Sequence, residues 1–363
     1  MKRNVSILQV SPTGYSKRSV IGGGEKIVLN IDHALRRAAA ELQLSLATSI
    51  LVLDGEAATV MSDHGIDCRS LQGRAWDPFS IHAGQLIERI ASSEIIYVHQ
   101  CLCQVGLYVA AHARLLGKVV IGMDAGAGEY PLVKSNPDVA RIYSAFHALS
   151  HFALSAYEEF AVPRHVICGP VDTDVYADSC SGERDPKTVL ALGRILPHKG
   201  FERIIEALPE SLTLTIIGSP YDEAYLAFLK EKSAGKSVTF LTGADDGEVR
   251  ERVKRAGLFV HASTHFDYQG RYSHKPELLG LAPLEALSMG LPALVSDAGA
   301  LPELAQLPGC WCFRSRTELS DLLEAHRAGA LQVPPPGVMH AAVTEHFGLL
   351  QCGEKLLQVM GVC

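Results

Sequence analysis

The sequence lacks several features that mark common classes of protein. Its 33 Lys and Arg stand against 40 Asp and Glu, a net charge of −7, so binding to nucleic acid is not expected. No stretch approaches the ~20 apolar residues that span a membrane. The first apolar run, Val5–Val10, is too short for the hydrophobic region of a secretion signal. We therefore expect a soluble, cytoplasmic protein.

The sequence also lacks the cysteine pattern of a disulfide framework. Its nine cysteines are odd in number and scattered through 363 residues, which favours a reducing compartment. Structural zinc usually takes four ligands from paired motifs, so the cluster His99, Cys101 and Cys103 is interpreted as buried thiols near a histidine. His261 and His265 are spaced four residues apart at a strand end, which leaves a role in lining a cleft open. No metal site is expected.

Short apolar runs alternate with longer amphipathic segments along the whole chain. In the first half, strands are expected at Val5–Val10, Thr48–Leu53, Glu94–Val98, Lys118–Gly122, Phe152–Ser155 and His165–Ile167, with a helix over Glu25–Glu41. The pattern restarts after Gly169-Pro170, with strands at Thr188–Leu192, Leu212–Ile217, Ser237–Leu241, Gly257–His261 and Pro292–Ser296. Such βαβ alternation predicts parallel sheets with helices on both faces.

The expected fold class is therefore α/β, with two Rossmann-like doubly wound domains that face each other across a cleft. The boundary falls near residues 168–187, where Gly, Pro, Asp and Ser concentrate. Ligands of such sheets bind outside the carboxyl ends of the strands, which makes the cleft the expected site.

Two glycine-containing segments follow first strands and suit anion binding. Gly22-Gly23-Gly24 opens the first helix, where glycine lets backbone N–H groups approach an anion; alone it is equally well explained as a flexible turn. In the second domain, Arg194 and Lys199 lie five residues apart in Gly193-Arg-Ile-Leu-Pro-His-Lys-Gly200. A planar guanidinium and a point charge at a strand end could clamp a diphosphate, although solvated surface charge explains them too.

A third segment, Pro276–Leu287, carries two carboxylates eight positions apart. Glu277 precedes a helix and Glu285 lies inside it, and carboxylates can accept hydrogen bonds from paired sugar hydroxyls. The start of that helix, around Gly280–Ala282, offers free amides for a phosphate.

Together these segments resemble glycosyltransferase family 4, whose members are retaining enzymes of the GT-B fold. The resemblance rests on GRxxxxKGF at residues 193–201, on E-x7-E from Glu277 to Glu285, and on the G-x-P and G-x-x-P-E sequences that begin at Gly290 and Gly299. It is ordered over about residues 168–305 and weaker before that. It implies an N-terminal acceptor-side domain of residues 1–168, a donor-binding domain of residues 169–340, and a last helix at about 341–363 that completes the first domain.

The resemblance also implies a role for each matching residue. Arg194 and Lys199 would bind the donor diphosphate, Glu285 the ribose hydroxyls, and Glu277 the donor sugar near its anomeric carbon. The remaining donor contacts would come from the amides of Leu279, Gly280 and Leu281, from Thr242 and Gly243 near the base, and from Gly23 and Gly24 of the first domain. The substrate would be a nucleotide-diphospho-sugar, with no cofactor or metal required.

Several features depart from the family pattern or stay open. Leu279 stands where the family usually has Phe. Asp124 falls where a sugar-proximal His is usual, with His99 as the other candidate. Residues 266–275 make a longer loop than the connection needs, and either set donor or acceptor selectivity or form a surface loop.

The acceptor is not readable: it is a glycan, a lipid-linked acceptor or a small molecule. Seven basic residues in the first 40 fit either an anionic, membrane-borne acceptor with peripheral membrane contact or a solvated helix face; they are Lys2, Arg3, Lys17, Arg18, Lys26, Arg36 and Arg37. The alternative functions are a GT-B sugar-nucleotide epimerase or hydrolase, and a non-catalytic sugar-nucleotide-binding module.

Overall fold

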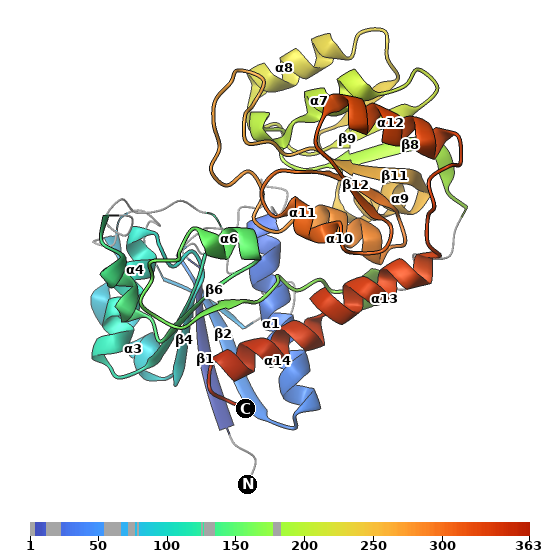
Figure 1. The fold of residues 1–363 in the computed structure, drawn as a ribbon. Helices are drawn as coiled ribbons and strands as arrows, with labels where there is room; N and C mark the ends of the chain where they lie inside the picture. Colours follow the sequence, from blue (N-terminus) through green and yellow to red (C-terminus); the bar gives the residue numbers. More distant parts are fainter. Residues whose placement is uncertain are drawn as a thin grey trace. The chain divides into compact units, whose positions relative to one another are not determined.

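The chain folds into two compact units, one formed by residues up to Pro170 together with Phe347–Cys363 and the other by Val171–His346. The computed structural model describes residues 4–11, 23–53, 67–71, 77, 80–124, 126, 135–176 and 183–363. Each unit is an open parallel sheet with helices packed against it (Figure 1).

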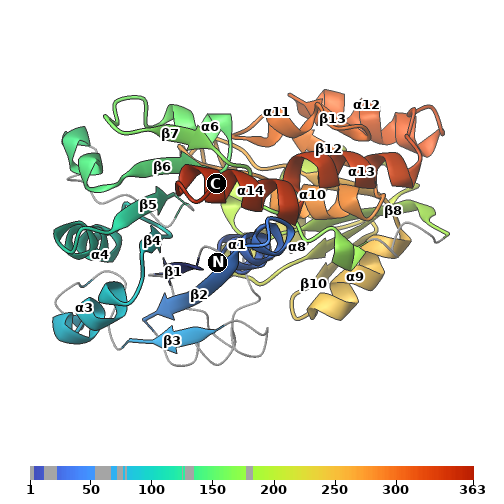
Figure 2. The same cartoon turned by 90° about the horizontal axis from the view of Figure 1, so that it is seen from below.

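The first unit contains a seven-stranded sheet of order β3-β2-β1-β4-β5-β6-β7, which Figure 2 shows from one edge to the other. All of its described pairings are parallel. The strands are β1 (Asn4–Ser11), β2 (Ser45–Val52), β3 (Cys68–Ser70), β4 (Ile95–Val98), β5 (Val119–Met123), β6 (Ala145–Ala148) and β7 (Arg164–Val166). The helical segments are α1 (Gly23–Glu41), α3 (Ala83–Ala91), α4 (Gln104–Leu115), η2 (Pro137–Ile142), α6 (His151–Ser155) and α14 (Leu349–Val359).

The helix α1 buries the apolar stripe that its sequence predicts. Its residues at helical spacing are at most 4% exposed, and they are Ile27, Ile31, Ala34, Leu35 and Ala38. The C-terminal helix α14 packs against α1. Gly353 makes this contact close, because a Cβ there would lie 2.1 Å from the carbonyl oxygen of Ala34. The last helix of the chain therefore completes the first unit.

One expected strand of this unit is wrong. Phe152–Ser155 is helical and belongs to α6. The side chain of Ser150 caps the helix by accepting a hydrogen bond from the Ala153 N–H at 3.0 Å. A serine cap favours a helical start over a strand, and a short apolar run alone does not separate the two.

The second unit contains a six-stranded parallel sheet of order β10-β9-β8-β11-β12-β13. The strands are β8 (Asp185–Leu192), β9 (Thr213–Ile217), β10 (Val238–Leu241), β11 (Ala256–His261), β12 (Ala293–Ser296) and β13 (Cys310–Phe313). The helical segments are η4 (Pro197–Lys199), α7 (Phe201–Ala207), α8 (Glu223–Lys232), α9 (Asp246–Arg255), α10 (Leu281–Ser288), α11 (Leu301–Leu304), α12 (Arg316–Arg327) and α13 (Pro336–Phe347).

Helices cover both faces of this sheet. Figure 1 shows α7, α8 and α12 on one side and α9 and α10 on the other, and α7 contacts both α8 and α12. The core beneath α7 joins side chains from several strands and helices, among them Val189, Ile216, Val260 and Ile204. Both units are thus doubly wound α/β structures, as the sequence predicts.

Candidate donor-binding site in the second unit

A buried ion pair lies where the strands of the second sheet end. The Lys199 Nζ donates to the Glu277 Oε2 at 2.8 Å. His261, the last residue of β11, places its Nε2 2.8 Å from the same oxygen. The Glu277 Oε1 accepts the Gly280 N–H at 3.3 Å. The Lys199, His261 and Glu277 side chains are only 13%, 7% and 15% exposed, so one carboxylate is fixed by three donors.

Local backbone geometry brings Lys199 to this position. Lys199 ends η4, and Gly200 follows in the left-handed region with φ of 63° before α7 begins. A Cβ on Gly200 would lie 2.2 Å from the carbonyl oxygen of Ala262. Because only glycine tolerates both the conformation and the close approach, the Lys199-Gly200 pair places the cation next to the end of β11.

The charge states of this cluster follow from its surroundings. Burial alone would raise the pKa of the Glu277 carboxyl, but the Lys199 ammonium and His261 outweigh it and hold that pKa well below its usual value. Burial lowers the pKa of His198 to about 4, and the charges of Lys199 and Arg194 act in the same direction. The site therefore holds an ionised Glu277 carboxylate and a neutral His198 imidazole at neutral pH.

The other predicted donor contacts of this unit follow along the same edge of the sheet. Arg194 follows β8, and its guanidinium lies 5.5 Å from the centre of the Tyr221 ring, which follows β9. Thr242 and Gly243 follow β10, and a Cβ on Gly243 would meet nothing within 4 Å. Because β10, β9, β8 and β11 are neighbours in that order, their carboxyl ends form one row.

The helix α10 supplies the remaining predicted contacts. Leu279 and Leu281 are 3% and 8% exposed, so both residues are buried. Gly280 precedes the helix with φ of 91°. Glu285 lies inside α10 and its Oε1 accepts a hydrogen bond from the Tyr176 hydroxyl at 3.1 Å.

The predicted residues of the first unit lie at the ends of its own strands and helices. Gly23 and Gly24 are the first residues of α1, and Gly22 lies outside the described residues, as do Lys2, Arg3, Lys17 and Arg18. Asp124 follows β5 and is 2% exposed. Its carboxylate accepts the Gly126 N–H at 2.8 Å and the Tyr157 hydroxyl.

His99 belongs to a buried polar network. Its side chain is 0% exposed, and its Nε2 lies 3.0 Å from the Gln9 Oε1. Gln9 in turn donates to Asp32 at 2.8 Å and to Thr48 at 3.1 Å.

Across the described residues, no group of three or more His, Cys, Asp or Glu side chains is arranged to hold a metal ion. In the same parts of the chain, no helix is both long and apolar enough to cross a membrane.

Sequence reasoning missed how His261 and Tyr176 are used. The spacing of His261 and His265 leaves only a role in lining a cleft open, whereas His261 contacts Glu277 directly. Tyr176 lies in the segment that leads into the second unit, and nothing in its spacing connects it to Glu285. A histidine that ends a strand next to a predicted anion site is the only signal that could have indicated the first contact.

Comparisons with known proteins find a family match over the part of the chain that carries this candidate site. Residues 179–309 match the family model described as "Glycosyl transferases group 1", and this stretch contains Arg194, Lys199, Glu277 and Glu285. The fold is similar to that of a crystal structure of Anabaena HepE in complex with UDP and glucose, with a TM-score of 0.76, 16% identity, and coverage of 99% of this chain and 100% of that chain. Residues 179–309, within the second unit, thus resemble the group 1 glycosyltransferases, and the fold of the chain is similar to that of its GT-B structural neighbours.

Two curated relatives match parts of the chain. The GDP-mannose-dependent alpha-(1-6)-phosphatidylinositol monomannoside mannosyltransferase of Mycolicibacterium smegmatis is 28% identical over 53% of this chain and 55% of its own length. The sulfoquinovosyl transferase SQD2 of Arabidopsis thaliana is 28% identical over 34% of this chain and 22% of its own length. The chain thus spans about half the length, or less, of these curated relatives.

Proposed function

We propose that the protein is a retaining glycosyltransferase. It moves a sugar from a nucleotide-diphospho-sugar to a hydroxyl of a glycan, a lipid-linked acceptor or a small molecule. The observation that carries the proposal is the Lys199–Glu277–His261 cluster at the carboxyl edge of the second sheet, inside the stretch that matches the family. HepE binds UDP and glucose, and the mycolicibacterial relative is named for a GDP-mannose donor, which supports a donor of this class.

In this proposal the row of strand ends binds the donor along its length. Thr242 and Gly243 lie nearest the base, Arg194 and Lys199 bind the diphosphate, and Glu277 binds the donor sugar. Cations next to a diphosphate form strong charge-assisted hydrogen bonds, and a guanidinium can do so through two N–H groups at once. Glu285 accepts hydrogen bonds from the ribose hydroxyls, with Tyr176 orienting its carboxylate. Gly23, Gly24 and Asp124 remain proposed contacts from the first unit.

The reaction depends on charge that develops as the sugar leaves. The transition state resembles an oxocarbenium ion, and the departing diphosphate gains negative charge. Arg194, Lys199 and the amides at the start of α10 stabilise that charge more strongly in the transition state than in the ground state. The acceptor hydroxyl attacks from the face of the leaving group, and a phosphate oxygen takes its proton. Configuration at the anomeric carbon is therefore retained without a dedicated protein base.

The test is ligand-dependent thermal stabilisation with UDP-, GDP-, ADP- and dTDP-sugars. A ligand present at about 100 times its dissociation constant should stabilise the protein by about 2.7 kcal/mol. One nucleotide should give this shift, and Arg194→Ala and Glu285→Gln should remove it. Arg316→Ala, whose side chain is 68% exposed on α12, is the matched control and should keep it. Absence of a shift with every donor, or a shift that survives both substitutions, would contradict the proposed donor site.

Substitution of Glu277 separates an enzyme from a binding protein. Glu277→Ala should abolish release of the nucleotide from the donor, whereas the intact nucleotide-sugar should still bind the variant and stabilise it. If the wild-type protein binds the donor and never consumes it, with or without added sugars, then the protein is a non-catalytic binding module.

A further inference from the structure

Residues Thr264–Lys275, here called the aromatic hairpin, connect the end of β11 to the loop that carries Glu277. Phe266 and Tyr272 pair across it in an antiparallel bridge, and the Ser273 N–H donates to the His265 carbonyl at 2.7 Å. The Thr264 N–H donates to the His198 carbonyl at 2.8 Å. The hairpin is therefore joined to the segment that precedes Lys199.

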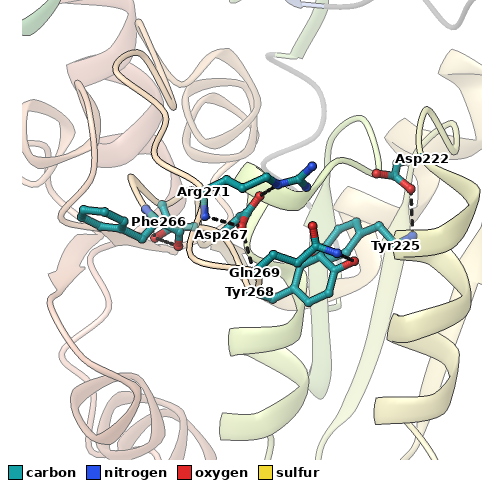
Figure 3. Close-up of polar contacts among 8 residues, drawn as sticks. Asp222, Tyr225, Phe266, Asp267, Tyr268, Gln269 and Arg271 are labelled. Atoms are coloured by element: carbon teal, nitrogen blue, oxygen red, sulfur yellow. Dashed lines mark hydrogen bonds and ion pairs between the residues drawn. The ribbon is translucent and has the colours of Figure 1, made fainter.

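The tip of the aromatic hairpin is held by one carboxylate. Asp267 accepts the Gln269 N–H at 2.9 Å, the Arg271 N–H at 3.0 Å and the Arg271 Nε–H at 2.8 Å (Figure 3). Burial works against ionisation of Asp267, yet these hydrogen bonds and the Arg271 charge lower its pKa. An aspartate that bonds the backbone two and four residues ahead fixes a turn.

A stack of aromatic rings fixes the hairpin to α8. The Tyr268 ring centre lies 4.3 Å from that of Phe228 and 5.3 Å from that of Tyr225. The Tyr225 hydroxyl accepts the Phe201 N–H at 3.0 Å, at the start of the helix that follows Lys199. Figure 3 shows Tyr268 beside Tyr225, with Phe266 on the opposite side of the hairpin. The hairpin is thus held against α8, which is itself bonded to the start of α7 just after Lys199.

On that opposite side the hairpin presents apolar rings to solvent. Phe266 is 62% exposed and Tyr272 is 53% exposed, and their ring centres are 5.0 Å apart. The third strongly exposed aromatic residue in the described parts of the chain is Tyr221, 51% exposed, on the β9–α8 loop. All three therefore follow strands of the second sheet at its carboxyl edge, which is where ligands of such sheets bind.

The strand order places the hairpin at the sugar end of the proposed donor site. The proposed base contacts follow β10, whereas the hairpin follows β11, three strand positions away. Neighbouring strands are about 4.8 Å apart, so the two lie about 14 Å apart along the edge. The hairpin also leads through Pro276 directly into Glu277, the proposed contact of the donor sugar. His265 also bonds the hairpin to a residue that lies against the Glu277 backbone, because its Nε2 accepts the Gly299 N–H at 3.3 Å.

We propose that Phe266 and Tyr272 form a stacking platform that binds the pyranose ring of a carbohydrate acceptor beside the donor sugar. The inference rests on the proposed function. One face of a pyranose carries C–H bonds with slight positive charge, which meet the negative face of an aromatic ring favourably. The Arg271 side chain, 59% exposed at the same turn, provides N–H donors for the sugar hydroxyls. A rigid platform costs little ordering entropy when the sugar binds.

The test measures sugar binding without turnover, by saturation-transfer NMR and titration. Maltotriose, mannotriose and diacetylchitobiose serve as separate probes, each with and without the nucleotide identified by thermal stabilisation. Saturation should pass to the ring C–H protons of at least one probe. Phe266→Ser and Tyr272→Ser should each raise its dissociation constant about tenfold, which corresponds to about 1.4 kcal/mol. Phe266→Trp and Tyr272→Trp keep the ring surface and should keep binding.

The matched control is Leu115→Ser, which removes an 85% exposed apolar side chain from α4 of the first unit and should change nothing. Three results would overturn the inference: no probe receives saturation, the serine variants bind as the wild type does, or they weaken nucleotide binding instead. The rings would instead be assigned to a lipid surface if the wild type binds phosphatidylglycerol vesicles and the serine variants lose this binding while they still bind sugar. If the wild-type protein binds a sugar probe but no nucleotide, the proposed function fails and this inference does not, because sugar binding is also measured without nucleotide.

Discussion

Lowering the pH from 7 to 5 should destabilise the first unit, because two histidines are buried there in their neutral form. His99 and His147 are 0% and 1% exposed. The pKa of each is lowered to about 3, mainly by burial and to a smaller extent by repulsion from the charged form of a neighbouring histidine, which is His147 for His99 and His165 for His147. Within the described residues, the Nδ1 atoms of both rings have no hydrogen-bond partner. Protonation would therefore bury an unpaired N–H as well as a charge.

The magnitude follows from the difference between the folded and unfolded chains. An unfolded histidine has a pKa near 6.5, so between that pH and the folded value near 3 the unfolded chain binds more protons. Stability then falls as the pH falls. From pH 7 to pH 5 the loss is about 2 kcal/mol for each histidine and about 4 kcal/mol for the pair. That is a large part of a typical domain stability of about 5–15 kcal/mol.

The assay is urea unfolding at both pH values, followed by circular dichroism, on the wild type and on His99→Gln and His147→Gln. Glutamine cannot titrate, but it can still bond Gln9 in place of His99, whose Nε2 contact is 3.0 Å, or Tyr97 in place of His147, whose contact is 2.5 Å. Each variant should lose about 2 kcal/mol less stability than the wild type over this range. Hydrogen exchange of β4 and β6 locates the change in the first unit. If both variants show the pH dependence of the wild type, these histidines are not buried as neutral rings.

Two further predictions concern the second unit. Gly218→Ala should destabilise the protein by about 1–3 kcal/mol, because its Cβ would lie 1.8 Å from the Gly193 carbonyl oxygen. The control Gly243→Ala should leave the stability unchanged, because the space around its Cβ is open. If calorimetry finds equal melting temperatures for the two variants, the close contact at Gly218 is refuted. Lys199→Met should raise the pKa of the Glu277 carboxyl, because burial is then opposed mainly by His261. A carboxylate ¹³C NMR titration measures this, and an unchanged pKa would mean that Lys199 does not hold Glu277 ionised.

The fold could be predicted from sequence where the hydrophobic pattern is strong. The apolar stripe on α1 predicts only a helix, and the buried runs of β1 and β8 predict only strands. The helices that alternate with the strands predict that the strands pair in parallel. The short elements could not be predicted in this way. Phe152–Ser155 is as apolar as a strand and became helical through the Ser150 cap. Cys310–Phe313, a four-residue strand at the sheet edge, is too short to show a period.

The site was predictable in its residue types and less so in its contacts. Lys199 and Glu277 are 78 positions apart, and the resemblance to a family, together with the rule that ligands bind at strand ends, brought them to one region. Nothing local in the sequence reveals that His261 shares the same carboxylate oxygen. The length of the loop after β11 was visible, whereas its preorganisation was not, because it depends on Tyr268 packing against residues of α8.

The shared oxygen of Glu277 bears on how the proposed donor would enter. Lys199 contacts the Glu277 Oε2 at 2.8 Å, yet the proposal also assigns this cation to the diphosphate. A diphosphate carries more charge than one carboxylate and would draw the ammonium toward itself. Glu277 would still be held by His261 on Oε2 and by the Gly280 N–H on Oε1. The carboxylate can therefore release Lys199 to the donor and keep its own orientation, which is what a residue that must meet the sugar in a fixed position requires.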